Sequence, residues 1–270
     1  MAAYHALVKA ELKAALLRLA IPVGAPFAGY YDTTDPAIVD TENSLFTNLP
    51  ESMPRGVTSL RFERGVAAPP ASPIPIELIR GHLHYYRFQV GGRWTAWEPD
   101  RTLARWDRCP RRLSFNGSAR PVWFAIRDAH ASGLIDISEE VLEPGMNFGL
   151  RLTVHATSTG PFNAMSCREE LVDGTIAAFH GDRYSEDLLS ALAPKFPGVT
   201  HEELCRALDH PVGPLFATRA ILTTKSVQFS PADDRCIAGE VTIQKDSTGR
   251  WPELSGELFI LRPMRTEDHH

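Results

Sequence analysis

Alternating apolar and polar positions in the first half of the chain predict β-strands. This pattern favours strands at residues 57–64 and 76–90, and an apolar run at 121–128 is typical of a buried strand. Two glycines at 91–92 follow the second of these strands, and the chain continues in an extended pattern at 93–97. We therefore expect a β-hairpin around the glycine turn.

Two segments that precede the first strand are less regular. Residues 6–20 combine good helix formers with apolar residues at helical spacing, although positions 8–14 also alternate as a strand does. Their composition favours a helix. Residues 21–56 are rich in proline, aspartate, threonine and asparagine and are expected to be irregular. Irregular stretches of this length inside compact domains tend to be functional or mobile.

Helical periodicity dominates after residue 165. An apolar stripe over residues 171–179 predicts one helix, and Ser185 is a suitable N-cap for a second. Thr200 and Glu203 have the spacing of a capping box, which opens a third helix. Strands are expected again at residues 227–229, 237–245 and 257–261. This order indicates an α+β fold, with a mostly antiparallel sheet and a helical cluster in the C-terminal half.

Length, composition and charge bound the domain count and the class of partner. The 270 residues suit one large domain or two of moderate size. The composition changes near residues 143–145, so we expect a β-rich half at 1–143 and an α+β half at 144–270, unless both form a single domain. A net charge of −5 argues against a protein that coats duplex nucleic acid or anionic lipid, and it leaves a local basic groove open.

Cysteine spacing and the N-terminal segment bear on the cellular compartment. None of the four cysteines lies within four residues of another, so there is no Cys-x-x-Cys metal or redox pair. Charged residues interrupt the first twenty positions, and no apolar run approaches the ~18 residues of a membrane span. We expect a soluble, cytoplasmic protein with reduced thiols and no membrane partner.

The densest group of candidate ligands lies at residues 32–43, where four carboxylates and an amide fall within twelve residues. Oxygen ligands of this kind suit hard divalent cations, and Asp40 and Glu42 point the same way if the chain is extended. We take these two residues as candidate ligands of Mg²⁺ or Mn²⁺ and as candidate catalytic carboxylates. The alternative is a solvated turn whose side chains cap backbone N–H groups.

A second group of candidates lies on the strand expected around residue 155. Alternation places Arg151, His155 and Thr157 on one face of that strand. Arginine suits a phosphate and histidine suits a general acid or base, so Arg151 is a candidate binding residue and His155 with Thr157 a candidate catalytic pair. The alternative is an exposed sheet face on which His155 is hydrogen-bonded to a threonine.

The segment His155-Ala156-Thr157 resembles one half of the motif of the 2H phosphoesterases. Members of that family carry two His-x-Ser/Thr strands that face each other across a cleft, and they act on cyclic phosphates or RNA ends. The resemblance implies that class of reaction. The other half of the motif has one candidate, His82-Leu83-His84, in which a histidine replaces the hydroxyl residue.

Tryptophan, tyrosine and arginine are interleaved from residue 85 to residue 106, which is the one locally basic aromatic region. Arg87, Trp94 and Trp97 are the candidate binding residues there. Aromatic rings beside arginine suit a nucleotide or single-stranded nucleic acid, and the same residue types form hot spots in protein–protein interfaces. The alternative is that these rings pack in the core of the hairpin.

Two hypotheses about function stay open. The first is a phosphoester hydrolase that acts on a nucleotide or RNA through the carboxylate cluster or the His-x-Thr strand. The second is a non-catalytic binding or assembly module that uses the aromatic-basic hairpin. Convergence of Asp40, Glu42 and His155 in space would favour the first, whereas an exposed patch of tryptophans at 94, 97 and 106 would favour the second.

Other patterns add little. The sequence contains no P-loop, dinucleotide-binding, hydrolase-elbow or zinc-protease motif, which lowers the expectation of those classes. Asp173 and His180 share one face of the predicted helix but stand two turns apart, about 10.5 Å by helical rise. We expect both on the wet side of that helix.

Overall fold

The computed structural model describes residues 2–35, 40–47, 49, 54, 56–66, 69–71, 83–140, 142–143, 145–157, 163–181, 185–209, 215, 220–222, 227–229, 233–246 and 251–264. The main sheet contains eight strands: β1 (Phe27–Thr33), β2 (Ser59–Arg64), β3 (His84–Val90), β4 (Trp97–Cys109), β5 (Asp136–Ile137), β6 (Phe148–Ala156), β9 (Cys236–Lys245) and β10 (Glu253–Pro263). Two further strands, β7 (Ala220–Leu222) and β8 (Val227–Phe229), pair separately.

Eight helices accompany these strands in the described residues. The α-helices are α1 (Ala2–Arg18), α2 (Thr41–Phe46), α3 (Arg120–Ala131), α4 (Ala164–Ala178), α5 (Glu186–Leu192) and α6 (His201–Leu208). Two short 3₁₀-helices are η2 (Ala193–Lys195) and η3 (Asp233–Arg235). No helix among these residues is both long enough and apolar enough to cross a membrane.

The strand order of the main sheet is β3-β1-β2-β9-β6-β10-β4-β5. The described strands pair antiparallel, except that β1 runs parallel to β2 and β6 runs parallel to β9. The fold is therefore α+β with a mostly antiparallel sheet, as the sequence predicts. Strands from both sides of residue 143 belong to this one sheet, because β9 lies between β2 and β6.

Six neighbouring strands of the sheet, β3-β1-β2 and β9-β6-β10, form two units of three strands with the same plan. A first strand (β1 or β6) is flanked on one side by a later parallel strand (β2 or β9) and on the other by a still later antiparallel strand (β3 or β10). Along the chain, α2 lies between β1 and β2, and α4 is the first of the helices between β6 and β9. The two units meet where β2 pairs antiparallel with β9.

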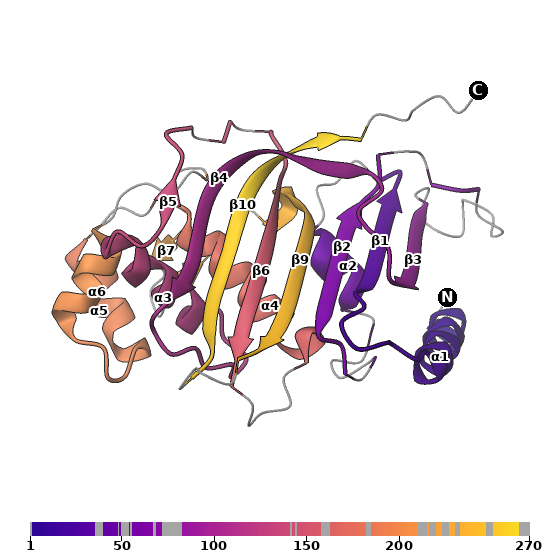
Figure 1. Ribbon diagram of the computed structural model, residues 1–270, viewed down its shortest axis with the longest axis horizontal. Coiled ribbons are helices and arrows are strands. Elements are labelled where there is room, and N and C mark those ends of the chain that lie inside the picture. Colours follow the sequence, from indigo (N-terminus) through magenta and orange to yellow (C-terminus); the bar gives the residue numbers. More distant parts are fainter. Residues whose placement is uncertain are drawn as a thin grey trace.

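The main core lies between the sheet and the helices on one of its faces. Figure 1 shows α2, α3 and α4 behind the sheet, with α5 and α6 at the β4 end and α1 at the β3 end. Every second residue of β6 from Leu150 to Val154 is buried in this core, together with Leu171 and Ile176 of α4. The residues between them, including Arg151, point to the opposite, open face of the sheet.

Part of the open face is covered by the segment that joins β3 to β4. Trp94 and Trp97 pack there on Phe259 and Leu261 of β10 and form a second, smaller apolar cluster. Beyond this smaller cluster, the open face carries polar side chains such as Arg151 and Glu240.

Several helices form where the sequence predicts them. Helix α1 covers the N-terminal segment expected to be helical. The Ser185 side chain accepts a hydrogen bond from the N–H of Leu188 and caps α5. Both hydrogen bonds of the Thr200–Glu203 capping box are present at the start of α6.

Residues 121–128 belong to helix α3, so the strand predicted there is wrong. The run from Val122 to Ile126 is apolar because the helix is covered on nearly all sides, by the sheet and by α4 and α6. A continuous apolar run does not distinguish a buried helix from a buried strand. Pro121 was the better signal, since proline suits the first turn of a helix.

The predicted hairpin is also wrong. Gly91 and Gly92 do turn the chain, with φ angles of 80° and 87°. However, β3 pairs with β1 at the edge of the sheet, whereas β4 pairs with β10 and β5. Of the strand expected at 76–90, residues 76–82 lie outside the described residues. The stretch 21–56, expected to be irregular, contains β1 and α2.

Candidate functional site

Asp40 and Glu42, the predicted catalytic and metal-binding carboxylates, lie at the start of α2. Asp40 is the N-cap residue, and its Oδ1 accepts a hydrogen bond from the N–H of Asn43 at 3.0 Å. The Glu42 side chain is 2% exposed and forms an ion pair with Arg168 of α4. The capping alternative therefore applies to Asp40, while Glu42 is turned into the protein.

Two further carboxylates, which the sequence does not associate with this segment, join them. The pKa of Asp173 on α4 is raised to about 8 by burial and then by the charges of Asp233, Asp40 and Glu42. Burial raises the pKa of Glu42 to about 7, against the opposing effect of Arg168. Burial and the charge of Asp40 raise the pKa of Asp233 to about 6. We call Asp40, Glu42, Asp173 and Asp233 the carboxylate cluster.

The sequence predicts that Asp40 and Glu42 bind a divalent metal ion. Within the described ranges, no group of three or more histidine, cysteine, aspartate or glutamate side chains is placed to hold one. The Mg²⁺ or Mn²⁺ site at Asp40 and Glu42 stays a prediction.

His155 lies on the open face of the sheet near the end of β6. Its Nε2 is 2.8 Å from the Oγ of Ser255 on β10, so the predicted hydrogen bond is to a serine and not to a threonine. Burial and then the nearby charge of Arg108 lower the pKa of His155. Thr157 is the first residue after β6.

The structure does not bring His155 together with the carboxylate cluster. Cys236, at the start of β9, has its thiol pKa raised by burial and then by the four cluster carboxylates. It pairs with Phe148 at the start of β6, whereas His155 pairs with Gln244 near the end of β9. Seven residues of strand separate Phe148 from His155, or about 23 Å. The two sets of predicted catalytic residues therefore lie at opposite ends of the strands.

His84, which stands at the hydroxyl position of the second candidate half of the 2H motif, lies on the edge strand β3. Strands β1, β2 and β9 separate β3 from β6. The Nδ1 of His84 is 3.0 Å from the hydroxyl of Tyr31 and 3.2 Å from that of Thr33. His82 lies outside the described residues. His84 and His155 therefore do not face each other.

Of the predicted binding residues of the aromatic-basic region, the two tryptophans are buried and Arg87 is exposed. Trp94 and Trp97 are 5% and 9% exposed, and Trp106 is 3% exposed, so they form no exposed aromatic patch. Arg87 lies over the ring of Tyr30 and lines a small hollow together with Trp94. The core alternative applies to the tryptophans.

Arg151 also belongs to this region, because its guanidinium lies 4.8 Å from the centre of the Trp94 ring. It occupies the middle of a row of alternating charges that crosses five strands of the open face: Arg61, Glu240, Arg151, Glu257 and Arg105. Within the row, Arg61 pairs with Glu240 at 3.0 Å and Arg151 with Glu257 at 2.6 Å. The positive charge of Arg151 is thus compensated by its neighbours.

A pocket of about 300 Å³ brings four basic side chains together, and three of them have no such compensation among the described residues. It lies between the loop that follows β4, the first turn of α3, and the segment from η2 to α6. We call it the basic pocket. Its lining residues are Arg111, Arg112, Ser114, Asn116, Ser118, Arg120, Pro121, Phe124, Lys195, Phe196, Pro197 and Val199. Four of these side chains are cationic, and among the described residues that line it none is acidic.

The four cations of the basic pocket differ in their partners. Arg111 is paired with Asp128 and Glu203. Arg120 donates from Nε to the Oγ of Ser118 at 2.9 Å. Within the part of the chain that the structure describes, Arg112, Arg120 and Lys195 form no ion pair. Three positive charges are therefore available to a ligand.

The loop beside the pocket is fixed by Glu170 of α4. The carboxylate of Glu170 accepts hydrogen bonds from the backbone N–H groups of Gly117 at 2.7 Å and Asn116 at 3.2 Å. The residue is 9% exposed, and burial raises its pKa although these N–H groups oppose the shift. The loop reaches α3 at Ala119, an N-cap residue that makes no side-chain hydrogen bond to the first turn.

Sequence reasoning missed the basic pocket because of one wrong assignment. The signal was present, since Arg111, Arg112 and Arg120 flank a polar segment just before Pro121. Had residues 121–128 been assigned to a helix, these cations would have been placed at a helix N-terminus, which favours anions. The contribution of Lys195 and Phe196 comes from tertiary contact and has no local signature.

Comparison of the chain with protein-family models, with curated proteins and with solved structures found no match.

Proposed function

We propose that the protein binds a phosphate-bearing ligand in the basic pocket. The observation that carries this proposal is the convergence of Arg112, Arg120 and Lys195 on one pocket without carboxylate partners among the described residues. Nine of the described arginines form ion pairs, whereas Arg112 and Arg120 form none there and share this pocket with Lys195.

The chemistry of the lining supports an anion of this type. Arginine binds phosphate through paired N–H donors, and lysine adds a compact charge. Ser114, Asn116 and Ser118 add neutral hydrogen-bonding groups. The first turn of α3 also presents the positive end of its helix dipole to the same space.

The experiment is a calorimetric titration with inorganic pyrophosphate, a small ligand that consists of phosphate groups only. We expect binding that weakens as salt rises, because charged contacts are screened. Arg112→Gln and Lys195→Gln should each lower affinity about tenfold or more, since hydrogen bonds to charged groups contribute roughly 1.5–3 kcal/mol.

The matched control is Arg101→Gln. Arg101 is an exposed arginine of β4 that pairs with Glu140, away from the pocket. It should leave pyrophosphate affinity unchanged. Absence of binding at millimolar pyrophosphate, or equal loss in the pocket variants and the control, would contradict the proposal.

A second candidate is hydrolysis of a phosphoester, which is one of the two functions that the sequence leaves open. The specific observation in its support is that pKa values of about 7 for Glu42 and about 8 for Asp173 suit general acid–base work near neutral pH. Glu170, which fixes the loop beside the pocket, lies one turn before Asp173 on α4.

The hydrolase candidate is tested with bis(4-nitrophenyl) phosphate and with nucleoside triphosphates as substrates. Activity that Asp173→Asn abolishes, while pyrophosphate binding persists, would support it. Activity that survives this substitution, or no activity on either class of substrate, would overturn it and leave the binding function alone.

A further inference from the structure

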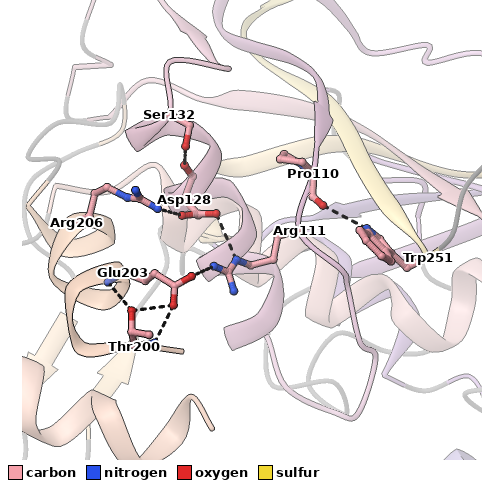
Figure 2. A network of polar contacts seen from close by, with 8 residues as sticks. All are labelled: Pro110, Arg111, Asp128, Ser132, Thr200, Glu203, Arg206 and Trp251. Atoms are coloured by element: carbon pink, nitrogen blue, oxygen red, sulfur yellow. Dashed lines mark hydrogen bonds and ion pairs between the residues drawn. The ribbon is translucent and has the colours of Figure 1, made fainter. Parts of the chain in front are cut away.

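One of the four cations of the basic pocket has a different role from the other three. The guanidinium of Arg111 lies over the ring of Phe124, 4.4 Å from its centre. Two edges of the guanidinium are held as well: Nε is 3.3 Å from Asp128 Oδ2, and Nη2 is 2.7 Å from Glu203 Oε1. Figure 2 shows this plane held between side chains from α3 and α6.

The groups that hold Arg111 are themselves fixed. Glu203 belongs to the capping box of α6, and the backbone N–H of Thr200 followed by Arg111 lowers its pKa to about 2. Asp128 also accepts from Nη2 of Arg206 at 2.9 Å. The charge of Arg111 is thus balanced by two carboxylates, so a ligand gains little from it as a cation.

What Arg111 offers to the pocket is a flat surface. Phe124 covers one face of the guanidinium, the carboxylates occupy its edges, and the residue still lines the pocket with 28% of its side chain exposed. A guanidinium plane stacks well on an aromatic ring, and nucleic-acid bases are commonly bound in this way. Phe196, Pro197 and Val199 add apolar wall beside it.

The geometry points to a nucleoside phosphate as the ligand, with its base stacked on the outer face of Arg111 and its phosphate held by Arg112 and Lys195. This inference rests on the proposed phosphate-binding function and adds the aromatic base. The volume of about 300 Å³ is at the lower end of the range for small-molecule sites, which favours a single nucleotide over a nucleic-acid strand.

The decisive comparison uses AMP and ribose 5-phosphate in calorimetric titrations of the unaltered protein. Both carry the phosphate and the sugar, and AMP alone carries a base. Stacking of one base corresponds to roughly a 5- to 150-fold gain in affinity, so AMP should bind tighter by that factor. Equal affinities would overturn the nucleotide inference and leave the phosphate function standing. If neither compound binds, the phosphate function fails too.

A variant then locates the base. Arg111→Lys keeps the positive charge and removes the plane, so AMP should lose most of its advantage while ribose 5-phosphate binds as before. Retained ribose 5-phosphate binding also shows that the pocket has folded, and the comparison in the unaltered protein decides the matter if this variant does not fold. An unchanged AMP advantage in Arg111→Lys would overturn the stacking on Arg111. A 5′-phosphorylated oligonucleotide that binds more than tenfold tighter than AMP would overturn the single-nucleotide ligand.

Discussion

Helix α3 is seated against α4 at Gly174, and this contact allows a sharp prediction. An added Cβ at position 174 would lie 2.6 Å from the carbonyl oxygen of Ala119 and 2.7 Å from the Cβ of Val122. Ala119 is the N-cap residue of α3 and directly precedes Arg120 of the basic pocket. Neither contacting atom can rotate away, because one is backbone and the other is attached directly to it.

The substitution Gly174→Ala sets two effects of opposite sign against each other. Alanine in place of glycine inside a helix stabilises by about 1 kcal/mol. Relief of the two contacts requires α3 to move by roughly 0.7 Å to reach ordinary van der Waals separation. Overpacking of this kind costs typically about 1–3 kcal/mol, and the rigid partners place it in the upper half of that range. We expect a net destabilisation of about 1–2 kcal/mol.

The measurement is the free energy of unfolding in urea, with unchanged dependence on denaturant concentration. The matched control is the same glycine-to-alanine step at Ser190, an exposed position in α5. There, the Ser190→Ala variant should be more stable than Ser190→Gly by about 1 kcal/mol. If Gly174→Ala proves as stable as the unaltered protein or more so, the close seating of α3 on α4 is wrong.

Four further outcomes follow from individual side chains. Arg127 is fully buried and donates to backbone carbonyls at the C-terminal ends of α4 and α6, so Arg127→Met should lower the free energy of unfolding by about 3–5 kcal/mol in urea titrations. The pKa of Asp173 is about 8 in the folded protein against an ordinary 3.8, so the folded state binds more protons between those values. Thermal stability should therefore fall as pH rises from about 4 to 8, and Asp173→Asn should flatten that fall. Trp94→Ala should destabilise by about 3–5 kcal/mol without a separate loss of nucleic-acid affinity, and a binding defect at unchanged stability would contradict the core assignment. A thiol-reactive dye should modify Cys205 first in the native protein and all four cysteines after denaturation; two or fewer reactive thiols in denaturant would contradict the reduced state.

What the sequence could predict was local. The capping box of Thr200 and Glu203 is specified by two side chains three residues apart, and it is present as expected. The apolar stripe of α4 and the cap at Ser185 are equally local. In each case the interacting groups lie within one or two helical turns of each other, so no tertiary contact is needed to recognise them.

What it could not predict depended on distant partners. The run at 122–126 is apolar because three other elements cover it, and that information is absent from the run itself. The glycine turn at 91–92 forms, yet β3 finds its partner in β1, which lies more than fifty residues earlier. Pairing between distant strands is decided by the burial of whole faces and not by a turn alone.

The candidate site also combines residues that local sequence identifies with contacts that only the folded chain creates. Asp40 and Glu42 are recognisable as a local group of carboxylates. The proximity of Asp173 and Asp233, which changes their pKa values, arises only when α2, α4 and η3 meet. The basic pocket likewise draws Lys195 from a segment about eighty residues after Arg112.

The position of β9 in the sheet has a consequence for how the chain is made. This strand fills the gap between β2 and β6, although both were synthesised long before it. Until residue 236 has left the ribosome, β2 presents one open row of backbone donors and acceptors, and β6 presents two, because its other neighbour β10 follows β9 in the chain. Open rows of this kind are the surfaces through which nascent sheets pair with wrong partners. Residues 236–270 thus join two half-sheets through β9, and a chain truncated before Cys236 should expose the edges of β2 and β6 to aggregation.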